Sequence, residues 1–259
     1  MTKTIATHNK IFHADEVTAV ALLKLFTQDE IVVQRVDHNR EDFSLFDMVI
    51  DISRKFDGVK YFDHHQHRGG KSSAGLIWEY LGVKKEYPKI SKLVKLVDDN
   101  DVGIVKAKPF EYSSLIKCFN SDPIDSPSQD EAFDKAVEFA MTILESMKTS
   151  QESLLKAKEI VENSYYFNNN PHIIELENFT PHWTSYINGQ TRAEIKAVVW
   201  QDEIDGKFKV KIPPKRVGSF ELNGKALKQD SENMEFVHST GFFAVAKSEK
   251  CMREFLSNI

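Results

Sequence analysis

Short apolar runs alternate with amphipathic helical segments along the N-terminal part of this chain, and this alternation restricts its fold more than any other feature. Strands are predicted at residues 4–7, 31–33, 48–50 and 60–62, and helices at residues 14–26, 72–81 and 90–97. Such short apolar runs are typical of strands that are buried on both faces of a parallel sheet. The order strand–helix–strand therefore indicates an α/β protein with a mostly parallel sheet in its N-terminal domain.

The middle of the chain has a different pattern. Residues 109–167 contain almost no strand signal, and residues 129–166 are predicted to form one long helix, or two helices that break near Thr149 and Ser150. Three asparagines at 168–170 and Pro171 then end the helix.

The last third of the chain returns to strands. They are predicted at residues 172–176, 195–200 and 208–212, and a final helix is predicted at 247–256. We therefore expect a first domain at residues 1–125, a helical connector at 126–168 and a smaller α+β domain at 169–259, with a cleft between the two domains.

Composition excludes several classes of protein. The chain has 34 Lys and Arg against 39 Asp and Glu, a net charge of −5, which argues against a protein that coats nucleic acid broadly. Its two cysteines, Cys118 and Cys251, have no metal-binding or redox spacing. No apolar run approaches the ~20 residues of a membrane helix, and the N-terminus lacks the apolar core of a signal peptide. We expect a cytoplasmic protein with no membrane partner.

Histidine and aspartate side chains collect at the ends of the predicted strands and helices, and six of the nine histidines come before residue 68. The four clusters are His8 with His13 and Asp15, Asp51 alone, Asp63 with His64 and His65, and Asp98 with Asp99, Asn100 and Asp101. In open α/β sheets, ligands bind beyond the carboxyl ends of the strands. We therefore expect the first three clusters to converge at one edge of the sheet.

This mixture of ligands suits a pair of divalent cations. Two such ions lower the pKa of an attacking water and neutralise charge on a transferring phosphoryl group. Aspartate favours Mg²⁺ or Mn²⁺, and histidine adds a preference for Mn²⁺. A single aspartate at a strand end, such as Asp51, is more often a cap or turn residue than a metal ligand. The metal hypothesis therefore depends on all four clusters occurring together.

Six segments in a fixed order carry a resemblance to a known family. They are Thr7-His8-Asn9-x-x-Phe12-His13-x-Asp15-Glu16, Val49-Ile50-Asp51, Tyr61-Phe62-Asp63-His64-His65-Gln66, Ser72-Ser73-Ala74-Gly75-Leu76-Ile77, Val97-Asp98-x-x-Asp101-x-Gly103-Ile104 and Phe236-Val237-His238-x-x-Gly241-Phe242. The chain resembles the metal-dependent hydrolases that include the melanocyte-proliferating-gene exonucleases, within the DHH phosphoesterase superfamily.

The resemblance implies two ions, Mn²⁺ or Mg²⁺, that share Asp51. His8 and His13 would hold the first ion with it. Asp15, His64 and a later aspartate would hold the second. Asp98 and Asp101 both match the position of that later aspartate, and Asp98 is the preferred ligand.

The remaining site residues also follow from the resemblance. Asp63 either orients the Asp-His-His triplet or reaches a metal, and His65 contacts the phosphate. We assign Asp51, His64 and His65 to catalysis. Substrate contacts are expected from His65 and Arg68 and, in a C-terminal segment that closes over the site, from His238, Ser239 and Gly241.

The function implied is a phosphoesterase that hydrolyses phosphodiester or phosphoanhydride bonds, foremost a 3′–5′ exonuclease on single-stranded RNA or short oligonucleotides. Trp183, Tyr186 and Trp200 are candidate stacking surfaces for bases, with core packing the preferred role of Trp200. The segment between Pro213 and Phe236 is shorter than in the family's longer members. This leaves open a small-molecule phosphatase acting on pyrophosphate, a nucleotide or a cyclic dinucleotide, and a non-catalytic binding module. The sequence also leaves a homo-oligomer open.

Overall fold

The computed structural model of the chain describes residues 1–66, 69–121, 128–187, 195–212 and 232–257. It divides into two compact units, Met1–Gln151 and Glu152–Ile259. Each unit has its own sheet and its own buried core.

A four-stranded parallel sheet forms the centre of the first unit. Its strands are β1 (Thr2–His8), β2 (Glu30–Val36), β3 (Met48–Ile50) and β4 (Tyr61–Phe62), in the order β2-β1-β3-β4. All neighbouring pairs are parallel, which confirms the predicted sheet. The chain passes from β1 to β2 on one side and then to β3 on the other. Strand order therefore reverses between β1 and β3, where ligand crevices form in open α/β sheets.

Local sequence signals explain where the helices of this unit begin and end. The helix α1 (Ala14–Phe26) starts after His13, whose backbone N–H donates to Glu16 Oε1 at 2.8 Å. The helix α2 (Ser73–Leu81) ends at Gly82, which takes the left-handed conformation with φ of 72°. Pro88 opens α3 (Pro88–Asp101), and a short helix α4 (Tyr112–Lys117) follows it.

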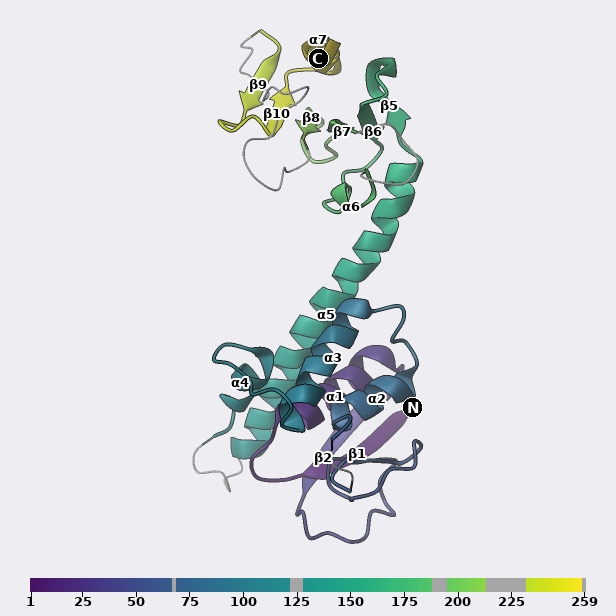
Figure 1. Cartoon of the computed structure of the whole chain (residues 1–259), viewed down its shortest axis with the longest axis vertical. Coiled ribbons are helices and arrows are strands. Elements are labelled where there is room, and N and C mark those ends of the chain that lie inside the picture. Colours follow the sequence, from purple (N-terminus) through teal and green to yellow (C-terminus); the bar gives the residue numbers. More distant parts are fainter. Residues whose placement is uncertain (67–68, 122–127, 188–194, 213–231, 258–259) are drawn as a thin grey trace. The chain divides into compact units, whose positions relative to one another are not determined.

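The two faces of the sheet are covered differently. Figure 1 shows α1, α2 and α3 together on one side, where Ile5, Met48 and Phe62 contribute to the main core. Ala6 and Val49 point to the other side and pack with Phe43 and Phe46 of the segment between β2 and β3. The helices and this segment bury both faces of the strands, as their apolar sequence requires.

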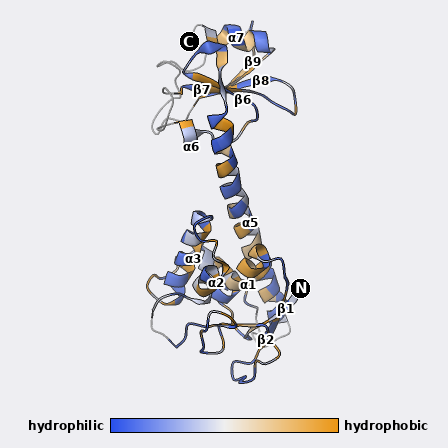
Figure 2. Cartoon of the chain, turned by 90° about the vertical axis from the view of Figure 1, so that its right-hand side faces the viewer, coloured by the Kyte–Doolittle hydropathy of each residue, from blue (hydrophilic) through white to orange (hydrophobic). Residues whose placement is uncertain are grey.

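A single long helix, α5 (Ser128–Glu162), runs from the first unit into the second. Figure 2 shows hydrophilic and hydrophobic residues alternating along its length, as in an amphipathic helix. Its first half adds Phe133, Ala140 and Leu144 to the main core, and Val161 near its end joins a core of the second unit. The helix is continuous at Thr149 and Ser150, and it ends four residues before the predicted position at 166.

The second unit is built on a mixed six-stranded sheet in the order β5-β6-β7-β8-β10-β9. The strands are β5 (Tyr165–Tyr166), β6 (Ile173–Leu176), β7 (Ala197–Gln201), β8 (Phe208–Lys211), β9 (Met234–Val237) and β10 (Phe243–Ala246). Only β6 and β7 pair in parallel. A 3₁₀ turn (Phe167–Asn169), the short helix α6 (Thr184–Ile187) and α7 (Glu249–Ser257) complete the described part. The strands β6, β7 and β8 were predicted, whereas β5, β9 and β10 were not.

None of the helices in the described ranges has both the length and the apolar character needed to cross a bilayer.

Candidate metal centre

Asp51 follows β3 directly and is the residue around which the site is arranged. Its side chain is 4% exposed, and its φ of 60° places it in the left-handed region, which aspartate tolerates better than most residues. Ser73 Oγ, at the start of α2, donates to Asp51 Oδ1 at 2.9 Å. Among the described residues, this carboxylate also contacts His8 at the end of β1 and His64 and His65 in the segment after β4.

The first group of potential ligands lies where β1 gives way to α1. His8 Nε2 is 3.1 Å from Glu16 Oε1 and 3.4 Å from Asp51 Oδ2. His13, the residue before α1, completes a set whose ligand atoms lie within 4.8 Å of one another: His8, His13, Glu16 and Asp51. Two imidazoles and two carboxylates in such a space could hold one divalent ion.

Two further groups are formed around His64, two residues after β4. Its Nε2 atom lies 3.3 Å from Asp51 Oδ1, 3.1 Å from Asp101 Oδ2 and 3.8 Å from Asp15 Oδ2. The resulting sets are Asp51 with His64 and His65, and Asp15 with His64 and Asp101. Asp51 is common to the first two groups and His64 to the last two. The groups are therefore continuous, as expected where neighbouring ions share a ligand.

The charges of this cluster are compensated by histidines. In the described part of the chain, every ion pair of Asp15, Glu16, Asp51 and Asp101 runs to an imidazole. Burial opposes protonation of His8, but its hydrogen bonds to Asp51 and Glu16 prevail and raise its pKa to about 11. In the same way, bonds to Asp101 and Asp51 outweigh burial and raise the pKa of His64 to about 10. The protonated imidazoles supply the positive charge that a bound cation would otherwise supply to balance the carboxylates.

Asp15 shows that these protons do not satisfy the whole cluster. Its side chain is fully buried, and neither carboxylate oxygen has a hydrogen-bond partner among the residues that the structure describes; Glu16 Oε2 also has none there. Burial, together with the negative charges of Asp51, Glu16 and Asp101, raises the pKa of Asp15 well above its ordinary value. Buried carboxylate oxygens without partners are costly unless they coordinate a cation. The residues present therefore fit divalent metal ions.

Asp63 is not part of the ligand groups and instead accepts hydrogen bonds from its own neighbourhood. Its Oδ2 accepts the backbone N–H of Arg54 at 2.7 Å, and its Oδ1 accepts the backbone N–H and the Nδ1 of His65 at 2.9 and 2.8 Å. Burial opposes ionisation of Asp63, but these bonds prevail and lower its pKa. The carboxylate thus orients His65, whose half-exposed ring lies beside that of His64 with a centroid separation of 4.5 Å. Of the two roles predicted for Asp63, this geometry favours orientation.

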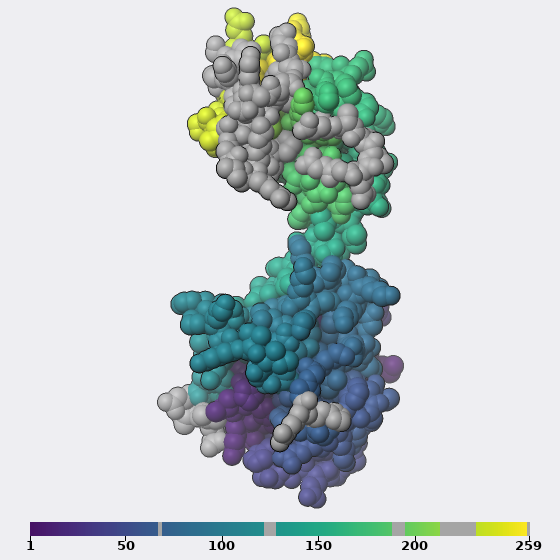
Figure 3. All heavy atoms as spheres, in the orientation of Figure 1, coloured from purple at the N-terminus to yellow at the C-terminus, as the bar shows by residue number. Residues whose placement is uncertain are grey.

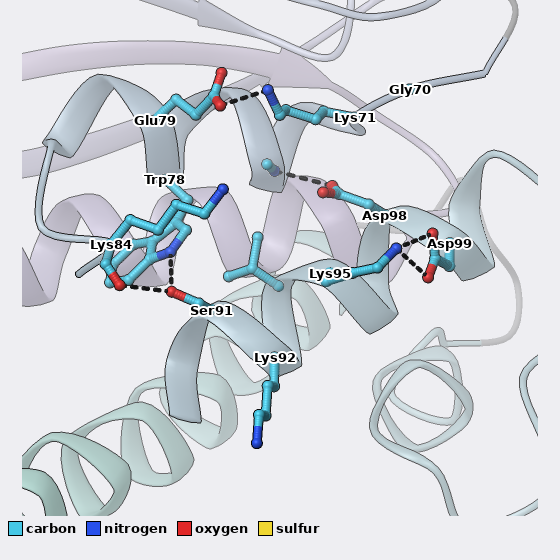
Figure 4. Close-up of a pocket in the computed structure, with 12 residues that line it drawn as sticks. Gly70, Lys71, Trp78, Glu79, Lys84, Ser91, Lys92, Lys95, Asp98 and Asp99 are labelled. Carbon is cyan, nitrogen blue, oxygen red and sulfur yellow. Dashed lines mark hydrogen bonds and ion pairs between the residues drawn. The ribbon is translucent and has the colours of Figure 1, made fainter. Parts of the chain in front are cut away.

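Asp98 and Asp101 make different contacts in the structure. Asp98 Oδ1 accepts the N–H and the hydroxyl of Ser72 at 2.9 and 2.7 Å and the N–H of Gly75 at 3.1 Å, so it holds the start of α2. Figure 4 shows it in a pocket between α2 and α3, beside the Lys95–Asp99 pair. Asp101 belongs to the His64 group instead. The geometry therefore favours Asp101, rather than the preferred Asp98, as the later aspartate.

The expected substrate residues fall in several places. His65 is in the cluster, and Arg68 lies outside the described residues. His238, Ser239 and Gly241 form the turn between β9 and β10 in the second unit.

The aromatic residues proposed for stacking are mostly buried. Trp183 is 1% exposed and Trp200 is 4% exposed, and both pack in the core with the partly buried Tyr186. Trp183 is therefore unavailable for stacking, and the predicted packing role of Trp200 is confirmed.

Comparison with known proteins supplies the family. The model of the MYG1 exonuclease family, described as "Uncharacterised protein family (UPF0160)", matches residues 4–258. The chain belongs to this family.

Relatives in this family span most of the chain. It is 26% identical to the MYG1 protein of Saccharomyces cerevisiae over an alignment of 321 positions, gaps included, which covers 98% of this chain and 94% of the yeast protein. It is 28% identical to the MYG1 exonuclease of Bos taurus over 305 residues, covering 92% of this chain and 79% of the bovine protein. The MYG1 protein of Chlamydia muridarum is 34% identical over 161 residues, covering 56% of this chain.

Two members of the cluster were not assigned from the sequence. Glu16 is fully buried beside Asp15, and two adjacent acidic residues at the start of an otherwise apolar helix were the available signal. Ser73, which donates to Asp51, was named only as part of the matched segment at residues 72–77, with no role of its own. Its place at the start of a helix gives no indication of a partner that lies 22 residues away.

Proposed function

We propose that this chain is a two-metal-dependent phosphoesterase of the MYG1 exonuclease family and acts as a 3′–5′ exonuclease on single-stranded RNA or short oligonucleotides. The convergence of three ligand groups on Asp51 and His64, at the carboxyl ends of β1, β3 and β4, carries the proposal. The bovine and mouse relatives, which are named exonucleases, support the substrate class. The histidine and aspartate motifs support placement in the DHH superfamily.

Each residue then has a defined task. His8, His13, Glu16 and Asp51 would hold one ion, and Asp15, Asp51, His64 and Asp101 would hold the other, with Mn²⁺ or Mg²⁺ suited to this donor set. Such ions lower the pKa of an attacking water and stabilise negative charge on phosphate. Asp51 lies between the groups, and Ser73 fixes the direction of its carboxylate. Asp63 holds His65 so that its free imidazole edge is available to a phosphate oxygen.

The second unit supplies further substrate contacts in this proposal. His238, Ser239 and Gly241 contribute them from the β9–β10 turn, and Gly241, with φ of 70°, supports a close backbone approach to phosphate.

The proposed cellular location is the cytoplasm. Two cysteines without a disulfide, Cys118 and Cys251, are consistent with its reducing conditions.

A small-molecule phosphatase is the second candidate. The net charge of −5 favours a substrate smaller than a polynucleotide. The bovine alignment runs to 305 residues, more than the 259 of this chain, so the relative contains segments that are missing here. Such segments are candidates for contacts with a longer substrate.

The test is hydrolysis of a 5′-labelled single-stranded RNA in Mn²⁺ by the wild-type chain and by Asp51→Asn. Asparagine also tolerates the left-handed backbone of this position, so the fold should be retained while both ligand groups lose a carboxylate. We expect stepwise release of mononucleotides from the 3′ end and a loss of at least ~100-fold in the variant.

Asp99→Asn is the matched control, because Asp99 pairs with Lys95 outside the cluster and should be dispensable. Substantial turnover by Asp51→Asn would contradict the two-metal site. Release of phosphate from pyrophosphate or nucleotides, without RNA cleavage, would establish the second candidate. No release from any substrate would indicate a binding module.

A further inference from the structure

A cavity next to the metal centre has no role in the site described so far. It has a volume of about 470 Å³, and its lining includes His13 and Asp101. Both residues belong to the ligand groups, so the cavity adjoins the centre. Figure 3 shows the N-terminal segment, in purple, at the surface beside the segments in blue and teal. The volume lies in the range of small-ligand sites, which is ~300–1,000 Å³.

Two lysines, Lys106 and Lys117, also line this cavity. Neither ammonium group has an ion pair or hydrogen bond with another residue in the ranges the structure describes. By contrast, Lys71 pairs with Glu79 and Lys95 pairs with Asp99. The only carboxylate among the lining residues is that of Asp101, which already pairs with His64. The cavity therefore offers two uncompensated positive charges beside a cluster of buried acids.

The segment that carries Lys106 is fixed on both sides. Asn100 Nδ2 donates to the carbonyl of Val105 at 2.9 Å, and the Val105 N–H donates to Asp99 O at 2.9 Å. Beyond it, Ser114 Oγ donates to the carbonyl of Lys108 at 2.8 Å. The backbone on both sides of Lys106 is thus fixed next to the cavity, which lowers the part of the entropic cost of binding an anion that comes from ordering the backbone.

An exposed aromatic ring follows in the same segment. Phe110 is 89% exposed, and its φ of 67° is a costly conformation for a bulky residue. It comes three residues after Ala107, which lines the cavity, and three residues of chain span at most ~10 Å. Single-strand nucleic-acid sites combine positive charges for the phosphates with aromatic rings for the bases, and the segment that carries Lys106 supplies both kinds of group.

We infer that this cavity is the subsite for the phosphate next to the scissile one in a single-stranded oligonucleotide, with Lys106 and Lys117 as its ligands and Phe110 as a stacking surface for the adjoining base. The inference rests on the proposed function, because the scissile phosphate is placed at the metal groups. Such a subsite favours a substrate that has at least two phosphates and a base. A lone phosphate ester would leave the subsite empty.

Equilibrium binding tests the subsite without turnover. The probe is a fluorescein-labelled phosphorothioate hexauridylate, which resists cleavage, titrated in Mn²⁺ by fluorescence anisotropy. We expect the Lys106→Gln/Lys117→Gln variant to bind about tenfold more weakly, with the slope of log affinity against log salt reduced by about 0.7 for one lost phosphate contact. Phe110→Ala should weaken the probe about tenfold as well. With tripolyphosphate, which has no base, only the lysine variant should lose affinity.

The controls keep the outcomes separate. Lys108→Gln, from the same segment, removes a charge outside the lining and should bind the probe like the wild type. Equal affinity of the double lysine variant and the wild type, or an equal loss in Lys108→Gln, would overturn the subsite. An unaffected Phe110→Ala would overturn the stacking surface. Failure of the wild type to cleave the unmodified hexauridylate, with the lysine-dependent binding intact, would refute the proposed function and leave the anion subsite standing.

Discussion

At the scale of residues, protons and metal ions compete for the same histidines. His8 and His64 have pKa values of about 11 and 10, so both imidazoles are protonated at pH 7 when no cation is bound. A metal ion needs the neutral imidazole. Binding must therefore displace these protons, and the raised pKa of Asp15 adds to the release if that carboxyl is also protonated.

We predict that Mn²⁺ binding at pH 7 releases at least one proton per chain. Because the bound state has fewer protons, the apparent affinity for Mn²⁺ falls as the pH is lowered, by roughly tenfold per pH unit for each proton released. Calorimetric titration in two buffers with different ionisation enthalpies measures the number of protons. An identical binding enthalpy in both buffers would contradict the prediction, and Asp51→Asn is the control for binding elsewhere.

The choice between Asp98 and Asp101 gives a second prediction at this scale. We expect Asp101→Asn to weaken Mn²⁺ binding at least ~10-fold with little change in stability, because it removes a partner of His64. Asp98→Asn should instead lower the free energy of unfolding by ~1–3 kcal/mol, because its carboxylate accepts three hydrogen bonds from Ser72 and Gly75. Metal titration and urea unfolding of both variants decide which aspartate is the ligand. The reverse pattern would make Asp98 the ligand.

The sequence could not separate these two aspartates for a physical reason. They stand three residues apart on one helix, so local spacing places both near the same edge. Their partners decide the roles, and these lie far away: Ser72 is 26 residues from Asp98, and His64 precedes Asp101 by more than thirty. By contrast, the positions of Asp51 and His64 in the cluster could be predicted, because Asp51 directly follows β3 and His64 comes two residues after β4.

At the scale of elements, the start of α2 leaves no room for a side chain at Gly75. A Cβ there would lie 2.5 Å from Asp98 Oδ1, and this buried carboxylate is held in place by its hydrogen bonds. We predict that Gly75→Ala lowers the free energy of unfolding by ~1–3 kcal/mol, measured by urea denaturation. In an Asp98→Ala background the same substitution should cost less, since the obstructing atoms are gone. An equal cost in both backgrounds would contradict this close approach.

Elements with strong local patterns were predicted well, and those defined by pairing were not. The residues of α1 and β3 coincide with the predicted 14–26 and 48–50, because a broad apolar stripe and a short apolar run are unambiguous there. The strands β9 and β10 have four residues each; β10 pairs with both β8 and β9, and β9 pairs with β10. Length alone does not explain why they were missed, since the predicted strands β6 and β8 have four residues as well. Their strand character depends on the partner.

At the scale of the whole molecule, α5 spans the division between the two units. That division falls after Gln151, inside the helix and within the connector expected at residues 126–168. The helix has no proline or glycine to mark the change, and its amphipathic pattern is the same whether it packs on one core or on two. Sequence periodicity shows which face is buried, and it does not show the core against which that face packs.

The last prediction concerns the two units. Each unit has its own core, and the metal centre lies in only one of them. All residues of the ligand groups belong to Met1–Gln151, so Mn²⁺ should stabilise this unit alone. At a free concentration of 100 times its dissociation constant, one ion adds about 2.7 kcal/mol. We expect differential scanning calorimetry to show two transitions, of which Mn²⁺ raises one and leaves the other unchanged. Asp51→Asn should remove this shift. A single transition that moves as a whole would instead mean that α5 couples the two cores into one cooperative unit.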